Sequence, residues 1–140
     1  MNKNIVYILT ILEAIEKVNI YSTGFTNSSS FHSSHSQLEF NASLTLLMAI
    51  AEESKKIDED LKRSQSKINW KSIYGFRNEL VHNYRGIDKQ IVWDIIKTKL
   101  EPLKKSCISM LKEINPDKNK LRSYVTSDFY KHLRYLSDLV

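Results

Sequence analysis

The sequence predicts an all-α protein: an up-and-down four-helix bundle with an extra helical segment at its C-terminal end. Its 140 residues include only three Gly and two Pro, too few for the frequent turns of an all-β chain. Apolar residues recur three and four positions apart along most of the chain. With 41% hydrophobic and 26% charged residues, the composition is that of an ordinary globular domain with one core.

The expected helices each have an apolar stripe with the helical repeat. The second is apolar nearly all round between residues 44 and 51, which predicts deep burial. Asn69 and Asp88 are suitable N-caps for the third and fourth helices, and Arg85-Gly86 ends the third. Pro102 should kink or restart the fourth helix, which then continues to about Ile114. The predicted helices cover residues 4–20, 37–61, 70–84, 89–114 with this interruption, and 127–140.

Two segments separate or end these helices. Residues 22–36 contain seven serines and predict a polar loop with at most one short turn around Phe31. Its His32 and His35 could bind a metal, but we interpret them as solvated loop residues because no Cys or carboxylate accompanies them. Asn115-Pro116-Asp117 breaks the chain again. We therefore expect a helical bundle over residues 1–115 and a helical extension over 116–140.

The net charge of +5 is concentrated in the last third of the chain. Residues 97–140 hold ten basic and five acidic side chains, whereas the earlier residues are balanced. Such an excess suits a polyanion such as RNA, although a solvated helix face in a lysine-rich protein explains it at least as well.

The single cysteine, Cys107, excludes an internal disulfide and any metal site made of several cysteines. We interpret it as a small buried hydrophobe. A lone thiol fits a reducing compartment, and no apolar stretch approaches the roughly 20 residues of a membrane span. The beginning of the sequence also lacks the pattern of an export signal. These features predict a cytoplasmic protein.

Several reactive side chains lie close together at the end of a core-forming helix, in residues 77–84, Arg-Asn-Glu-Leu-Val-His-Asn-Tyr. On an ideal helix Arg77 and Tyr84 lie within about 20° of one face, and Asn78 stacks with His82. His82 lies about 140° round from Arg77, so one straight helix does not aim both at a single point.

The pattern Arg77-x4-His82-x-Tyr84, with Asn78 after the arginine, resembles the signature of HEPN-domain proteins and, more closely, of the HepT-like toxins. Residues 70–76 before it and 86–96 after it are similar to that subfamily as well, and the resemblance extends over about residues 1–114. Where the subfamily has an Ile-Gly-Glu-Ala-like stretch, this chain has Ile50-Ala51-Glu52-Glu53, so Glu52 takes the usual carboxylate position.

The resemblance implies a homodimer in which the motifs of both chains meet in one cleft, and metal-independent RNA cleavage that needs no cofactor. Arg77 and His82 would be the catalytic residues, with Asn78 and Glu52 in support. Tyr84 would be the residue to which a cognate MNT-type nucleotidyltransferase antitoxin adds AMP. The partners would be RNA, this antitoxin and a second copy.

The sequence also leaves other interpretations open. Arg77 could be a structural ion-pair partner of Glu52 or Glu53, and His82 a terminal residue that binds the last helix carbonyls. Tyr84 could be a packing aromatic. The chain would then be a non-catalytic module that docks a nucleotidyltransferase or presents its substrate, or it would bind RNA through its basic C-terminal third.

Overall fold

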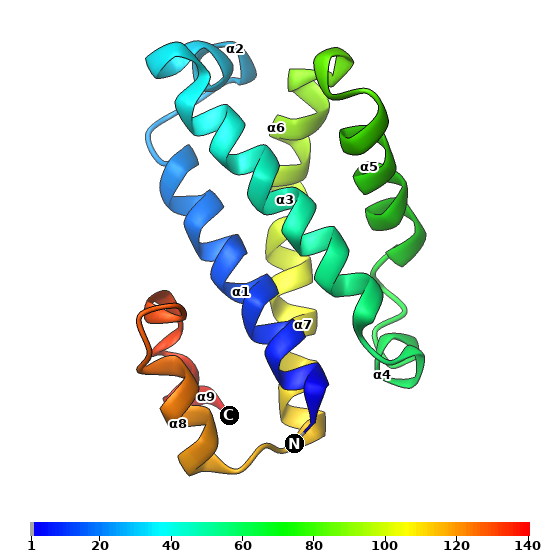
Figure 1. Cartoon of the computed structure of the whole chain (residues 1–140), viewed down its shortest axis with the longest axis vertical. Helices are drawn as coiled ribbons and strands as arrows, with labels where there is room; N and C mark the ends of the chain where they lie inside the picture. Colours follow the sequence, from blue (N-terminus) through cyan, green and yellow to red (C-terminus); the bar gives the residue numbers. More distant parts are fainter. Residues whose placement is uncertain (1) are drawn as a thin grey trace.

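A computed structural model describes residues 2–140, and this part of the chain is helical throughout, as predicted, with no strand. No helix in it is long and apolar enough to span a membrane. Figure 1 shows the arrangement of α1 (Lys3–Ser22), α2 (Ser28–Ser33), α3 (Leu38–Lys56), α4 (Glu59–Arg63), α5 (Trp70–His82), α6 (Lys89–Thr98), α7 (Leu100–Ile114), α8 (Lys118–Val125) and α9 (Leu136–Leu139), with 3-10 turns at Ser34–Gln37, Tyr84–Gly86 and Lys131–Leu133.

Helix α1 lies at the centre of the core. It packs against α3 most extensively, then against α7 and the C-terminal extension (Figure 1). Because it has neighbours on several sides, its fully buried residues are not confined to one stripe. They are Ile8, Leu9, Ile11, Leu12, Ile15 and Val18. Cys107 on α7 is also fully buried, which raises the pKa of its thiol to about 12 and confirms that it is a core residue.

The second predicted helix, 37–61, is shorter than expected, since α3 ends at Lys56. Ile57 has an extended backbone and is buried, and the Asn4 side chain fixes the next residue. Asn4 Nδ2 donates to Asp58 Oδ2 and Asn4 Oδ1 accepts from the Asp58 N–H, both at 3.0 Å. This long-range pair holds the break, and α4 begins directly after it.

The serine-rich segment is more ordered than a polar loop. The turn expected around Phe31 is α2, whose N-cap Asn27 accepts from the Ser30 N–H. Phe31 is 1% exposed and its ring lies 5.3 Å from that of Trp93. Three successive residues with positive φ, His35 to Gln37, then turn the chain into α3. Burial of the Phe31 ring thus anchors the serine-rich segment to the core.

The helix predicted over residues 127–140 is wrong for most of its length. The regular helix of the extension is α8, capped by Asp117, and only short turns follow it. Side chains from these turns bind α1 instead: the Tyr130 hydroxyl lies 3.1 Å from Thr10 Oγ1, and His132 binds Glu13. The extension therefore packs against α1, on the side away from α5 (Figure 1).

Candidate active site

Helix α5 carries the motif and begins at its predicted cap. Asn69 Oδ1 accepts from the Ser72 N–H at 3.1 Å, and the helix then runs without interruption to His82. The following turn brings Tyr84 back over α3 before Asp88 caps α6. A Cβ at Gly86 would lie 2.6 Å from Asn83 Oδ1, so a larger residue there would displace the Asn83 side chain.

Helix α5 is held mainly by α3. Leu80 is its only buried residue among those described. On its other side an open cleft of about 370 Å³ separates it from the α6–α7 region. The cleft is lined mostly by apolar side chains, among them Leu47, Ile50, Ile73, Phe76, Ile95 and Leu103. The orientation of α5 therefore depends on Leu80, on the partly buried Trp70, Ile73 and Phe76 that pack against the core, and on polar contacts with α3 and α4.

Arg77 faces α3 and pairs with Glu52. Its Nε donates to Glu52 Oε1 at 2.7 Å, and both side chains are about two-fifths exposed. A weaker contact of 3.5 Å joins Arg77 Nη1 to Asn78 Oδ1. Glu53, the other carboxylate considered from the sequence, pairs with Lys56. Among the described residues nothing else bonds the guanidinium, so its outer N–H groups are accessible to a bound anion.

Tyr84 and His82 lie at the exposed end of α5. The Tyr84 hydroxyl donates to Asn41 Oδ1 at 3.2 Å, and the side chain is 48% exposed. His82 is the last residue of the helix and is exposed, and its ring has no hydrogen-bond partner within residues 2–140. The structure therefore does not support the two alternatives in which Tyr84 is a packing aromatic and His82 binds the last helix carbonyls.

Asn41 is a site residue that sequence reasoning missed. It lies on the first turn of α3, eleven residues before Glu52. Eleven residues are close to three helical turns, so both project from the same face of α3. Following that periodicity back from Glu52 would have pointed to Asn41. The site is thus a row on the surface of α3 and α5, with Arg77–Glu52 at one end and Tyr84–Asn41 at the other.

The structure does not bring Arg77 and His82 to one point within a chain. They stand five residues apart on an uninterrupted helix, which places them about 140° apart around its axis. Arg77 is held towards α3, whereas His82 is free to meet another molecule. The chemistry available is a cation held by a carboxylate, an exposed imidazole and an exposed phenol, a set suited to a phosphodiester.

His32 and His35 lie outside this row and contact different groups. The His32 ring packs edge-on against Phe40 with 4.6 Å between centroids. His35 Nδ1 lies 2.9 Å from Glu39 Oε2, and this hydrogen bond lowers the pKa of the Glu39 carboxyl. The two histidines therefore do not face a common ligand.

Gly75 offers a test of whether the outer face of α5 is free. It lies in the middle of the helix, and a Cβ there would meet nothing within 4 Å. We expect Gly75→Ala to raise the free energy of unfolding by about 0.5–1 kcal/mol, because alanine loses less backbone entropy on folding. Urea denaturation measures the change. A loss of stability would instead show that another chain packs closely at this position in solution.

Comparison with known proteins finds one matching family and several relatives. The family model described as ribonuclease HepT-like matches residues 11–110. Two relatives come from Methanocaldococcus jannaschii. One, named as a gamma-glutamylcyclotransferase and putative RNase, is 28% identical over 89% of this chain and 54% of its own length. The other, named as a putative RNase, is 34% identical over 54% of this chain and 63% of its own.

A protein of Thermococcus cleftensis named as a probable ribonuclease HepT is 35% identical over 45% of this chain and 57% of its own length. The matches therefore span little more than half the length of these curated relatives. No solved structure matches the chain significantly.

Proposed function

The chain belongs to the HepT-like ribonuclease family, and on this premise we propose that it is a metal-independent endoribonuclease that acts as the toxin of a toxin–antitoxin pair. The observation that carries the proposal is the accessible row on α3 and α5, in which Glu52 holds Arg77 and leaves its outer nitrogens exposed, together with the exposed His82 at the end of α5. RNA would be the substrate and the cytoplasm the place of action.

The proposed reaction uses the RNA's own nucleophile. The ribose 2′-oxygen attacks the adjacent phosphorus while the bond from phosphorus to the 5′-oxygen breaks, leaving a 2′,3′-cyclic phosphate and a 5′-hydroxyl. His82 would accept the 2′-hydroxyl proton or supply a proton to the leaving oxygen. Arg77 would stabilise the charge that builds on the phosphate, with Asn78 supporting it. Glu52 would fix the guanidinium plane through Nε.

A homodimer would solve the geometric problem within one chain. Exposed apolar side chains surround the motif: Leu38 at the start of α3, Val81 on α5, Tyr84, and Ile91 on α6. Their elements meet at one end of the molecule (Figure 1). Such a group suits a contact between copies. We propose that this end is the dimer interface, so that Arg77 of one chain completes a site with His82 of the other.

The same proposal assigns the architecture. Helices α1, α3 and α5, with α6 and α7 as the fourth member, would make up the four-helix bundle of residues 1–115. The extension, 116–140, would be an addition to it. Because the extension packs on α1, it lies away from the motif helix α5 (Figure 1). This placement favours the motif over the extension as the site of RNA cleavage.

Tyr84 would be the point of control by a cognate nucleotidyltransferase antitoxin. Within residues 2–140 its hydroxyl bonds only Asn41, and nearly half of the side chain is exposed. Transfer of AMP would join the tyrosine oxygen to the α-phosphorus of ATP and release pyrophosphate. The added phosphate would repel RNA and fill the row between Tyr84 and Arg77.

The chemistry of the product tests the proposed reaction. We expect the purified protein to cut a mixed RNA in excess EDTA and to leave 2′,3′-cyclic phosphate ends, because the ribose hydroxyl is the nucleophile. The measurement is gel separation of end-labelled RNA, after which the new ends are identified enzymatically. A 2′-O-methyl substrate should resist cleavage. Cleavage of that substrate, or cleavage only with added metal, would contradict the mechanism.

If the purified protein cuts nothing, its intact mass distinguishes two explanations. An AMP-sized adduct on Tyr84 would identify a silenced toxin. An inactive chain without an adduct would support the alternative function, a non-catalytic module that docks a nucleotidyltransferase.

A further inference from the structure

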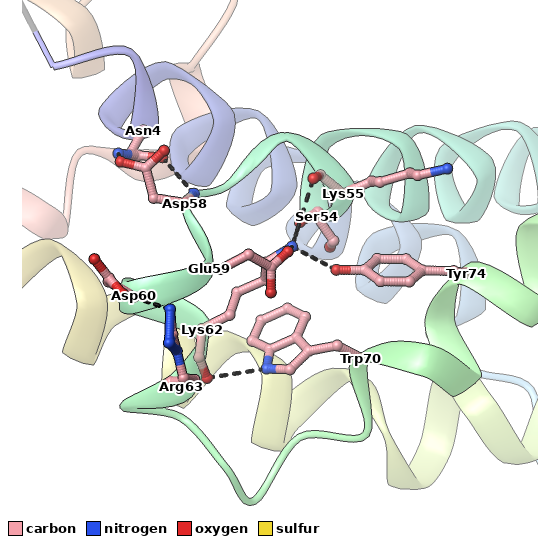
Figure 2. Close-up of polar contacts among 10 residues, drawn as sticks. All are labelled: Asn4, Ser54, Lys55, Asp58, Glu59, Asp60, Lys62, Arg63, Trp70 and Tyr74. Atoms are coloured by element: carbon pink, nitrogen blue, oxygen red, sulfur yellow. Dashed lines mark hydrogen bonds and ion pairs between the residues drawn. The ribbon is translucent and has the colours of Figure 1, made fainter.

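Lys62 of α4 is a buried lysine between the end of α3 and the start of α5. Only 2% of its side chain is exposed. Its Nζ donates to the Ser54 carbonyl at 3.1 Å and to the Tyr74 hydroxyl at 2.5 Å, with a longer contact to the Lys55 carbonyl (Figure 2). One ammonium group therefore caps α3 and binds α5.

The backbone and aromatic neighbours of Lys62 add to this bridge. The Trp70 indole N–H donates to the Lys62 carbonyl at 3.2 Å (Figure 2). The ammonium lies 5.1 Å from the centre of the Tyr74 ring and 5.9 Å from that of Trp70. Both ends of the residue thus hold the first turns of α5 through cation–π contacts and hydrogen bonds.

The location of the charge indicates a role other than stability. Burying an ammonium group costs free energy that an apolar side chain of similar size avoids. The one carboxylate paired with Lys62 among the described residues, Glu59 at 3.2 Å, is itself 76% exposed. What the lysine provides, and an apolar residue cannot, is a directed bond from the end of α3 to the hydroxyl of Tyr74.

This bridge runs parallel to the Arg77–Glu52 pair. Tyr74 precedes Arg77 by three residues on α5, close to one turn, and Ser54 follows Glu52 by two residues on α3. The two links therefore join the same pair of helices about one turn apart. Among the described residues of α5 only Leu80 is fully buried, Ile73 and Phe76 are partly buried against the core, and a cleft borders the helix on its other side. The polar links to α3 therefore add to this apolar packing in setting the rotation of α5.

We propose that Lys62 is a positioning residue: its bridge from the end of α3 to Tyr74 sets the rotation of α5 that brings Arg77 to Glu52. The expected effect on RNA cleavage rests on the proposed function. The expected effect on the Arg77–Glu52 contact is independent of that function, so the positioning role and the ribonuclease activity are tested separately.

The test compares Tyr74→Phe, which removes one hydroxyl and keeps the ring, with Glu59→Gln. The control, Glu59→Gln, removes the ion-pair partner of the Lys62 ammonium but leaves its hydrogen bonds to α3 and α5 in place. The first readout is the NMR signal of the Arg77 Nε–H, assigned by its loss in Arg77→Lys. We expect its exchange with water to accelerate at least about tenfold in Tyr74→Phe and to stay unchanged in Glu59→Gln. An unchanged Arg77 signal in Tyr74→Phe would overturn the proposal.

The second readout is RNA cleavage under single-turnover conditions. Tyr74→Phe should lower the rate by about tenfold and change RNA affinity by less than about twofold, because misalignment affects the reacting geometry more than binding. Lys62→Met, where it folds, should show the same loss, and the double variant no further loss. A lower melting temperature with unchanged rate per folded molecule would reduce Lys62 to a structural role. A parent that is inactive without an adduct on Tyr84 but gives the expected NMR result would refute the ribonuclease and leave the positioning role intact.

Discussion

Replacement of Arg77 or His82 by alanine is expected to lower RNA cleavage at least about 100-fold in each case, because each removes one charge- or proton-handling group from the reaction. The loss should appear in the rate rather than in the fold. Both side chains are partly or largely exposed, and the core lies elsewhere. Arg77→Ala also frees Glu52, which is exposed enough to remain solvated.

Matched controls distinguish the motif from general charge. Arg85 and His35 are exposed residues of the same types outside the proposed catalytic pair. Arg85→Ala and His35→Ala should cut RNA within about threefold of the parent, since neither is placed on the reacting phosphate. If Arg77→Ala or His82→Ala cuts at the parent rate, the assignment of roles fails. Circular dichroism on each variant excludes loss of fold as the cause.

The largest effect on stability is expected at the contact between the extension and α1. The Glu13 carboxylate is 2% exposed and accepts from the His132 N–H at 3.1 Å and from His132 Nδ1 at 2.8 Å. His132→Ala leaves this buried carboxylate with the backbone N–H as its remaining partner among those the structure gives it. We expect a loss of about 2–3 kcal/mol in the free energy of unfolding, the cost of an under-paired buried charge.

Urea denaturation of His132→Ala measures this loss, and His35→Ala serves as the control for removing an exposed histidine. The control should change stability by less than about 0.5 kcal/mol. A change in His132→Ala as small as in the control would mean that residues 116–140 do not dock on α1 in solution.

The sequence predicted the long helices well because their signals are local. Asn69 and Asp88 cap α5 and α6 as expected, and the helix predicted over residues 4–20 lies within two residues of the observed ends of α1. The segments it missed depend on distant partners. Residues 130–133 have helical spacing, yet Tyr130 and His132 bind α1 and hold the chain in short turns. The Asn4–Asp58 pair, 54 positions apart, likewise ends α3 where the local pattern would continue it.

The same difference between local and distant signals applies to the site. The sequence predicted the motif on α5 because its residues are neighbours in the chain. The sequence could not decide whether Glu52 or Glu53 pairs with Arg77, since this depends on how α3 is rotated against α5, a property of tertiary packing. Asn41 and Lys62 contact the motif region from other elements. The helical repeat back from Glu52 points to Asn41, whereas no local pattern marks Lys62.

The most direct test of the shared site is to co-express Arg77→Ala and His82→Ala chains and measure RNA cleavage in EDTA. In a mixed dimer the His82→Ala chain supplies Arg77 and the Arg77→Ala chain supplies His82, so one of its two sites is complete. With random pairing about a quarter of all sites are restored, and we expect about a quarter of the parent activity. A mixture as inactive as either variant alone would contradict a site built from two chains.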